Sequence, residues 1–293
     1  MPELPEVEAL ARFLEERVAG MRIASVTLAS LSALKTFSPS LPEITGQRVS
    51  RVRRRGKFLD LSTDEGLHLV WHLSRAGWVQ WREEVPSTPV KPGKGPLALR
   101  LSFVTDDGEP AGGIDITEAG TQKRLALYVV RDPSEVPGIA RLGPDALSED
   151  LTEEAFAGIL AAAGRSQVKG VLRSQSTIAG IGNAYSDEIL HAAGLSPFHP
   201  CSTLTPEDVS HLYACMRQQL TTAIANSVGH GTGTLKAEKK ASLAVHGRAG
   251  QPCPVCGDTV REVSFADSAL QYCPTCQTGG KLLADRRMSK LLK

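Results

Sequence analysis

The 293-residue chain is predicted to be a multidomain α+β protein, in which an N-terminal β-sandwich with a leading helix precedes a helical domain and a C-terminal β-hairpin. Three observations predict this order. Short apolar runs fill positions 22–131, helical stripes follow up to about 235, and two Cys-x-x-Cys pairs stand near the end. We therefore expect a first domain at 1–131, a linker at 132–148, a helical domain at 149–235, a cysteine module at 243–277 and a basic tail at 278–293.

The leading helix is predicted over residues 5–18. Pro5 suits the first turn of a helix, apolar side chains recur at helical spacing from Val7 to Val18, and Gly20 follows as a stop. Turn residues then separate eight short apolar or alternating runs, the pattern of an all-β sandwich or barrel. We expect strands at 23–28, 49–53, 58–61, 67–73, 78–81, 97–103, 114–116 and 125–130, with a mobile loop at 84–96.

The second domain is predicted to be helical. Residues 152–163 carry an apolar face, and a short helix is expected at 183–193 between two glycines. A third helix begins at Thr205, a capping residue that is followed by Pro206 and two acids in the first turn. It continues to Gly229, where a glycine-rich loop leads to the cysteine pairs.

The cysteine spacing is the strongest local signal in the sequence. Two Cys-x-x-Cys knuckles on a hairpin can supply four thiolates in the tetrahedron that Zn²⁺ prefers. A redox role would not need two pairs, and a catalytic zinc would need an open ligand position. We therefore predict one structural Zn²⁺ that stabilises a module too small to hold a core alone. Its ligands would be Cys253, Cys256, Cys273 and Cys276.

Charge and composition place the protein only broadly. Net charge is +1 with 41% hydrophobic residues, but basic side chains gather near 48–57, 236–261 and 281–293. Taken singly, each stretch can equally be a solvated surface. No apolar run approaches the roughly 20 residues of a membrane span, and Glu3, Glu6 and Glu8 stand where a signal peptide is positive. We expect a cytoplasmic protein with no membrane partner, where paired cysteines favour metal over disulfides.

Two segments can carry chemistry. If Met1 is removed, Pro2 presents a secondary amine beside the carboxyl of Glu3, and such an amine can attack an aldehyde-like carbon to form a Schiff base. Residues 175–183 place glycines directly before a helix, where backbone N–H groups and Asn183 can hold a phosphate. A tight glycine turn with a purely structural role is the alternative for this second segment.

Five motifs stand in one order along the chain. They are Pro-Glu-Leu-Pro-Glu-Val-Glu at 2–8, Gly-Lys-Phe-Leu at 56–59, Ile-Ala-Gly-Ile-Gly-Asn-Ala-Tyr at 178–185, His-Gly-Arg-Ala-Gly-Gln-Pro-Cys at 246–253 and the final cysteine pairs. Together they closely resemble the formamidopyrimidine-DNA glycosylase and endonuclease VIII family, over about residues 2–277. The resemblance implies an N-terminal β-sandwich, a helix–two-turn–helix domain and a zinc finger.

The resemblance also implies roles for individual residues. Pro2 would be the nucleophile on C1′ of a damaged deoxynucleotide, with Glu3 as acid and base and Glu6 as a proton relay or an amine-orienting group. Glu6 fits a helix-capping role almost as well. Lys57, Asn183 and Arg248 would contact phosphates of the DNA. The implied activity is that of a bifunctional glycosylase and abasic-site lyase, which cuts the strand by β,δ-elimination after the nucleotide has been flipped out.

The implied partner is double-stranded DNA that contains an oxidised base or an abasic site. We expect the protein to act as a monomer, associated with the nucleoid of a bacterium. Zinc would be its one cofactor.

The sequence departs from the family pattern at three places. Where a Met usually follows His-Leu-Gly to fill the vacated duplex, this chain has His72-Leu-Ser-Arg75; where an Arg-Arg-Phe-Gly wedge usually stands, Lys123 lies in Thr-Gln-Lys-Arg. Arg75 and Lys123 are therefore candidate DNA contacts. Ser268 replaces the Arg that usually lies five residues before the third cysteine. Loss of the usual wedge favours oxidised pyrimidines and abasic sites over 8-oxoguanine.

A second interpretation stays open at this point. A DNA-binding protein of the same fold, with little base-excision activity, would also lack the wedge and the hairpin Arg. Such a binder would have no reason to keep the Pro2-Glu3 pair and Lys57, and these residues favour the enzyme.

Overall fold

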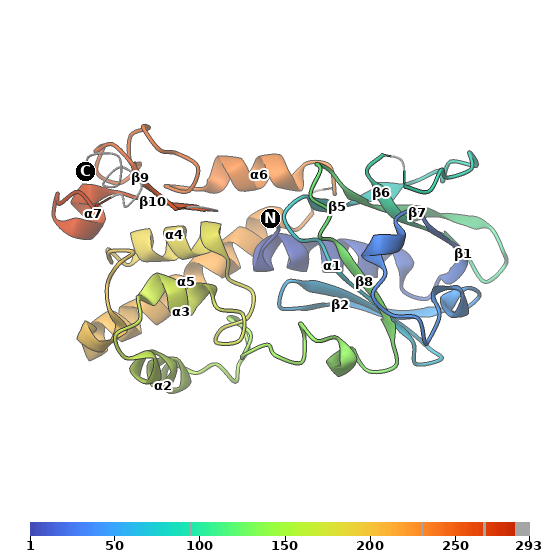
Figure 1. Cartoon of the computed structure of the whole chain (residues 1–293), viewed down its shortest axis with the longest axis horizontal. Coiled ribbons are helices and arrows are strands. Elements are labelled where there is room, and N and C mark those ends of the chain that lie inside the picture. Colours follow the sequence, from blue (N-terminus) through green and yellow to red (C-terminus); the bar gives the residue numbers. More distant parts are fainter. Residues whose placement is uncertain (94, 230, 266–267, 285–293) are drawn as a thin grey trace. The chain divides into compact units, whose positions relative to one another are not determined.

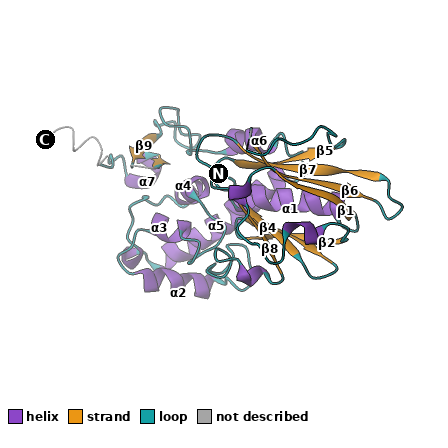
Figure 2. Ribbon diagram, turned by 45° about the vertical axis from the view of Figure 1, so that its right-hand side comes forward, coloured by secondary structure: helices purple, strands orange, loops and turns teal. Residues whose placement is uncertain are grey.

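The computed structural model describes residues 1–93, 95–229, 231–265 and 268–284, and the chain divides into two compact units (Figure 1). Unit 1 comprises residues 1–141 and 227–236; unit 2 comprises residues 142–226 and those from 237 onward. Strands dominate the first unit and helices the second (Figure 2), which confirms the predicted α+β class. Among the described residues, no helix combines the length and the hydropathy that a membrane crossing requires.

Unit 1 contains two four-stranded antiparallel sheets. One has the order β1-β6-β7-β5 and the other β2-β3-β4-β8, and helix α1 (Leu4–Val18) packs on β2 and β3. The strands are β1 (Arg22–Leu28), β2 (Val49–Arg55), β3 (Phe58–Thr63), β4 (His68–His72), β5 (Gly77–Arg82), β6 (Leu97–Val104), β7 (Pro110–Glu118) and β8 (Ala126–Val130). Single 3₁₀ turns lie at Leu31–Ala33, Leu41–Ile44 and Pro133–Glu135.

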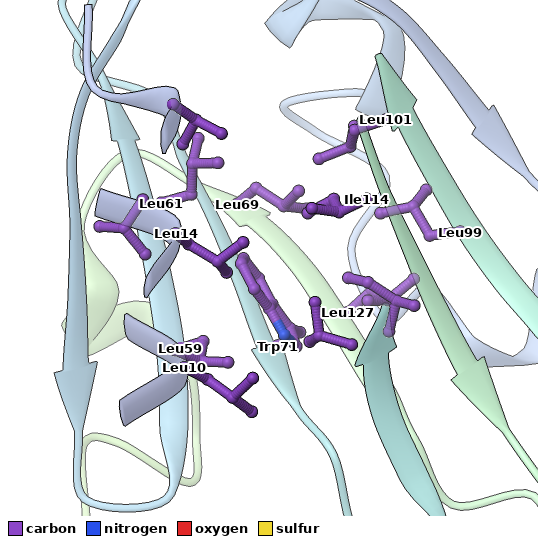
Figure 3. Packing of buried hydrophobic residues seen from close by; sticks show 14 of the residues in the cluster. Leu10, Leu14, Leu59, Leu61, Leu69, Trp71, Leu99, Leu101, Ile114 and Leu127 are labelled. Atoms are coloured by element: carbon purple, nitrogen blue, oxygen red, sulfur yellow. The ribbon is translucent and has the colours of Figure 1, made fainter. Parts of the chain in front are cut away.

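The core of unit 1 follows from alternation along the strands. Every second side chain points to the same face of a sheet, so Leu59 and Leu61 of β3 lie with Leu69 and Trp71 of the paired strand β4. Figure 3 shows these side chains meeting those of the other sheet and of α1, namely Leu99, Leu101, Ile114, Leu10 and Leu14. Trp71 is fully buried at this junction. Burial of such a side chain contributes roughly 1.5–3 kcal/mol, so this layer holds the two sheets together.

β7 is longer than the sequence predicted. We expected a strand only at 114–116, whereas β7 also includes Gly112 and Gly113, a residue type that usually weakens strands. A Cβ atom on Gly113 would lie 2.4 Å from the carbonyl oxygen of Leu101 in β6, so only glycine allows the two strands to pair here. The two glycines are therefore part of the paired strand.

Unit 1 also takes a segment from far along the chain. Thr232 is buried, its carbonyl oxygen accepts a hydrogen bond of 2.6 Å from Trp78 Nε1, and Leu235 joins the apolar core. The sequence placed this segment in a flexible loop before the cysteines. It is instead tied to β5 and precedes a helix, α6 (Leu235–Ser242), that was not predicted.

Unit 2 is built on helices and a small hairpin. The helices are α2 (Glu153–Ala163), α3 (Val168–Arg173), α4 (Asn183–Ala192), α5 (Pro206–Ser227) and α7 (Pro274–Thr278), with a 3₁₀ turn at Cys201–Thr203. The hairpin pairs β9 (Arg261–Ser264) with β10 (Ala269–Tyr272). The cap predicted at Thr205 is present, since the backbone N–H of Asp208 donates to Thr205 Oγ1 at 3.2 Å, and the backbone N–H of Ala155 donates to Thr152 Oγ1 at the same distance. The part of the predicted basic tail at 285–293 lies outside the described residues.

Candidate functional site

Pro2, Glu3 and Glu6 form the buried start of α1. Glu3 is the residue that caps the helix, and its backbone N–H donates to Glu6 Oε2 at 2.8 Å in a capping box. The side chains of Glu3 and Glu6 are 3% and 1% exposed. Two carboxyl groups are therefore held within one helical turn of Pro2, and the hydrogen bond fixes the backbone that carries the proline.

Lys57 lies in the turn between β2 and β3, toward which the start of α1 points. Glu15 accepts a hydrogen bond from the backbone N–H of Val52, and Glu8 pairs with Arg54 at 2.9 Å, so α1 runs antiparallel to β2. A helix rises about 1.5 Å per residue and a strand about 3.3 Å. The five residues from Glu8 back to Glu3 therefore span about the same length as two strand residues. Two residues beyond Arg54 the chain has reached the turn that contains Lys57.

His72 at the end of β4 is the titratable group beside Lys57. It pairs in register with Phe58, and the two rings lie 4.7 Å apart. Burial and the positive charge of Lys57 lower the pKa of His72 to about 4. The imidazole is therefore neutral near pH 7, and Lys57 supplies the positive charge at this place.

Arg75 and Lys123 are exposed in unit 1. Arg75 follows Ser74, whose φ of 53° is unusual for a residue with a side chain, in a turn that closes where Gly77 approaches the carbonyl of Leu73. Lys123 Nζ donates to the carbonyl oxygen of Glu118. The sharp turn presents Arg75 outward, whereas Lys123 has a contact within the protein.

The glycine turn before α4 is braced from inside unit 2. Gln175 Oε1 accepts from the backbone N–H of Gly180 at 3.1 Å, and Gln175 Nε2 donates to the carbonyl of Ile181 at 2.7 Å. Gly180 has a φ of 105°, which favours glycine strongly. Asn183 begins α4, and its Nδ2 donates at 2.7 Å to the carbonyl of Ala269 in β10. In this structure the Asn183 amide thus joins the helix to the zinc-finger hairpin.

Glu188 of α4 holds the segment that leads to Arg248. Glu188 accepts hydrogen bonds of 2.7–3.0 Å from three backbone N–H groups, those of Ala244, Val245 and His246. Burial raises the pKa of Glu188, although these donors favour its charged form. The half-buried Arg248 follows directly, and its guanidinium contacts Gln251 and the carbonyl of Leu243.

Asp187 forms a second buried network in unit 2. Its carboxylate pairs with Lys169 Nζ at 2.6 Å and with His246 Nδ1 at 2.7 Å, and Asp187 is fully buried. Lys169 Nζ also donates to the carbonyl of Asn183 at 3.2 Å. The network ties α3 and the segment of His246 to the start of α4, so it fixes the backbone from which Asn183 projects.

The four predicted zinc ligands converge in unit 2. Sγ of Cys253 lies 3.9 Å from Sγ of Cys276, and Sγ of Cys256 lies 3.3 Å from Sγ of Cys273. A Zn²⁺ ion with bonds of about 2.3 Å holds tetrahedral sulfurs roughly 3.8 Å apart. The donor set and its spacing therefore fit one zinc ion, which these four residues would hold.

His191 enters the same cluster and was not foreseen. Its ring nitrogen and the sulfurs of Cys253, Cys273 and Cys276 all lie within 4.8 Å of one another. His191 is on α4, far from the cysteines in sequence, so no local spacing signal could have revealed it. The same is true of Lys169, Asp187 and Glu188, whose roles depend on contacts between distant segments.

Comparison with known proteins assigns the family. The family model of the formamidopyrimidine-DNA glycosylase N-terminal domain matches residues 1–121, that of the formamidopyrimidine-DNA glycosylase H2TH domain matches 142–235, and that of the zinc finger found in FPG and IleRS matches 250–279. The formamidopyrimidine-DNA glycosylase of Symbiobacterium thermophilum is 33% identical over 98% of this chain and 93% of its own length. The chain belongs to the formamidopyrimidine-DNA glycosylase family.

Further relatives support the family assignment. A formamidopyrimidine-DNA glycosylase-like protein of Mycobacterium tuberculosis, described as uncharacterized, is 57% identical over 52% of this chain and 94% of its own length. The solved MutM (Fpg) protein of Thermus thermophilus superimposes with a TM-score of 0.76 at 30% identity, covering 96% of this chain and 100% of that one. Lactococcus lactis Fpg bound to DNA with an abasic site gives a TM-score of 0.79 at 26% identity, covering 94% and 99%. The predicted sandwich, helix–two-turn–helix and zinc-finger architecture is thus confirmed.

Proposed function

We propose that this protein is a bifunctional DNA glycosylase and abasic-site lyase that excises oxidised bases through a Schiff base on Pro2. The observation that carries the proposal is the arrangement at the start of α1, where Pro2 is buried beside the capping-box pair Glu3 and Glu6. Once Met1 is removed, Pro2 has a secondary amine that is partly neutral near pH 7 and can act as a nucleophile.

The reaction begins when the amine of Pro2 attacks C1′ of the damaged deoxynucleotide. The bond from C1′ to the base breaks, and the base leaves with its electron pair and a proton. Glu3 protonates the ring oxygen as the sugar opens, which leaves an iminium ion between Pro2 and C1′. The positive nitrogen acidifies C2′, and loss of that proton expels the 3′ phosphate by β-elimination. A further proton loss expels the 5′ phosphate by δ-elimination, and water releases Pro2.

The other parts of the molecule bind DNA in this proposal. Lys57 contacts a phosphate beside the damaged nucleotide, since its turn lies at the end of β2 toward which α1 points. Asn183 and Arg248 contact phosphates from unit 2, while Arg75 and Lys123 remain candidates on unit 1. A zinc ion bound to the cysteines would stabilise the hairpin and would take no part in the reaction.

Partner and location follow from the same proposal. The substrate is double-stranded DNA with an oxidised base or an abasic site, and Lactococcus lactis Fpg has been solved with DNA of both kinds. We expect a cytoplasmic, nucleoid-associated monomer. A panel of oligonucleotides that each carry one lesion identifies the preferred base, and oxidised pyrimidines are expected to be cut faster than 8-oxoguanine because the usual wedge residues are absent.

Borohydride trapping on an abasic oligonucleotide tests the proposal. Borohydride reduces an iminium ion to a stable amine, so the wild-type protein is expected to become covalently linked to DNA. Pro2→Gly should retain zinc and DNA binding but lose most lyase turnover. A matched pair of samples gives a sharper comparison. In the first sample an N-terminal extension keeps the Pro2 nitrogen in an amide, and in the second a protease has removed the extension and freed the amine of Pro2.

The outcomes separate the two interpretations. Trapping only after Pro2 is released, with Met1 absent by mass spectrometry of the active protein, supports the enzyme. Equal trapping by the blocked and the released chain would assign the amine to another residue. Tight DNA binding with no trapping in either form would instead support the DNA-binding alternative.

A further inference from the structure

The sulfur of Cys253 lies in a part of unit 2 that water does not reach. Cys253 is 2% exposed and Cys273 is fully buried, whereas Cys256 is exposed. Four thiolates around one Zn²⁺ carry a net charge of −2. A buried anionic sulfur is costly unless it accepts hydrogen bonds, and at this place the protein must supply them.

His191 is the side chain that meets this need. Its Nε2 lies 3.2 Å from Sγ of Cys253, and the residue is 7% exposed on the last turn of α4. A metal-bound thiolate has no proton to donate, so the imidazole nitrogen must be the donor. The buried His191 ring therefore makes its hydrogen bond to a candidate zinc ligand. This contact gives a physical reason for a polar side chain at a buried position.

Neighbouring contacts hold α4 against the second cysteine knuckle as well. Gln277 Nε2 donates to the carbonyl of Leu195 at 2.8 Å, and Gln277 Oε1 accepts from the backbone N–H of Cys273 at 2.8 Å. A side chain at Gly194, directly after α4, would reach 3.5 Å from the carbonyl of Cys276. The end of α4 therefore lies against the second knuckle, and this packing supports the position from which His191 reaches Cys253.

We propose that His191 is a positioning residue of the zinc centre: its Nε2–H donates to the Cys253 thiolate, stabilises the bound ion and couples the zinc finger to α4. Hydrogen-bond partners of metal ligands typically change metal affinity by 10- to 100-fold. Because Asn183 begins the same helix, zinc binding also stiffens the element that carries a proposed phosphate contact.

The test compares zinc affinity and zinc release in the full chain. His191→Phe keeps a ring of similar size without the donor, and His191→Gln keeps an N–H donor. His199→Phe is the matched control, since His199 also lies in unit 2 but bonds Thr203, not a cysteine. Zinc is measured by metal content and by transfer to a chromophoric chelator, and thermal unfolding checks that each variant is folded.

Wild type is expected to hold one zinc per chain. His191→Phe should bind zinc about 10-fold or more weakly and release it faster. His191→Gln and His199→Phe should stay within a few-fold of wild type. Unchanged zinc affinity in folded His191→Phe would overturn the role of His191, whereas absence of zinc from wild type would overturn the zinc centre itself.

Cobalt(II) substitution distinguishes a hydrogen bond from direct coordination. If His191 acts through Cys253, wild type and His191→Phe should both show the spectrum of four thiolate ligands. A wild-type spectrum of three sulfurs and one nitrogen, lost in His191→Phe, would place His191 in the coordination sphere and overturn the hydrogen-bond assignment.

Discussion

Glu3 has a capping role at the start of α1 and, in the proposed reaction, a second role as the acid. Its backbone N–H is held by Glu6, and its carboxyl stands next to the proposed nucleophile. The hydrogen bond from the Glu3 backbone N–H to Glu6 is part of the folded structure and is made whether or not the reaction takes place. The proton that the proposal assigns to Glu3 is needed only when the sugar ring opens, so substitution can separate the two roles.

We expect Glu3→Gln to lose base excision by about 100-fold or more, the usual magnitude for a general acid. Cleavage of a preformed abasic site should fall less, because the opened aldehyde form needs less acid assistance than an intact glycosidic bond. Single-turnover rates on a lesion and on an abasic oligonucleotide measure the two effects. Glu16→Gln, an exposed glutamate on the same helix, should change neither rate. An equal loss on both substrates would remove Glu3 from ring opening.

Some candidate site residues could be predicted from the sequence and others could not. Pro2, Glu3 and Lys57 stand in contiguous motifs, and the cysteines have the paired spacing that is typical of zinc sites. Lys169 and Asp187 are 18 positions apart, and His191 and Cys253 are 62 apart, so no short motif joins them. Their functions arise only when α4 is packed, and no local pattern encodes that packing.

At the scale of elements, prediction followed the length of the repeating pattern. The strands of unit 1 were located from short apolar or alternating runs, each of which overlaps one strand of the structure, and α1 and α5 carry long apolar stripes. Helices α3, α6 and α7 are six, eight and five residues long, too short to show a clear stripe. Neighbouring glycines made them resemble loops.

The β2–β3 turn of unit 1 carries a candidate DNA contact that can be tested by binding. Lys57 is a proposed phosphate contact, so Lys57→Ala should weaken binding to damaged and undamaged duplex alike and lower the slope of log K against log salt by about one. Arg248→Ala should act in the same way. Arg12→Ala is the control, because it also removes a positive charge from unit 1. Glu8, the ion-pair partner of Arg12, still pairs with Arg54 in this variant.

Ser268→Arg tests the hairpin in the opposite direction. Ser268 lies at the tip, where its carbonyl accepts from the backbone N–H of Phe265 at 2.7 Å, and an Arg there adds a cation without replacing a buried group. Affinity should rise and the salt slope should steepen by about one. If Lys57→Ala reduces both quantities and Ser268→Arg changes neither, the hairpin tip does not reach the phosphates.

The whole molecule consists of two units with separate cores. Unit 1 has a large apolar core between two sheets, which stands without any metal. Among the residues that the structure describes, the zinc finger has few buried apolar side chains, including Val245, Val260 and Tyr272. So little apolar burial rarely stabilises a module of this size alone, and its zinc-finger family and clustered cysteines fit a metal that supplies the remaining stability.

Zinc removal should therefore act on one unit and spare the other. With a strong chelator, hydrogen exchange is expected to accelerate over residues 245–279 and, through His191 and Gln277, at the end of α4. Strands β3 and β4 should keep their protection, because their core contains no zinc-dependent contact. Mass spectrometry of exchanged peptides gives both results in one experiment, and restoring zinc should reverse the change. Loss of protection in β3 and β4 at the same chelator concentration would show that the two units unfold together, whereas unchanged exchange over 245–279 would show that the hairpin is stable without metal.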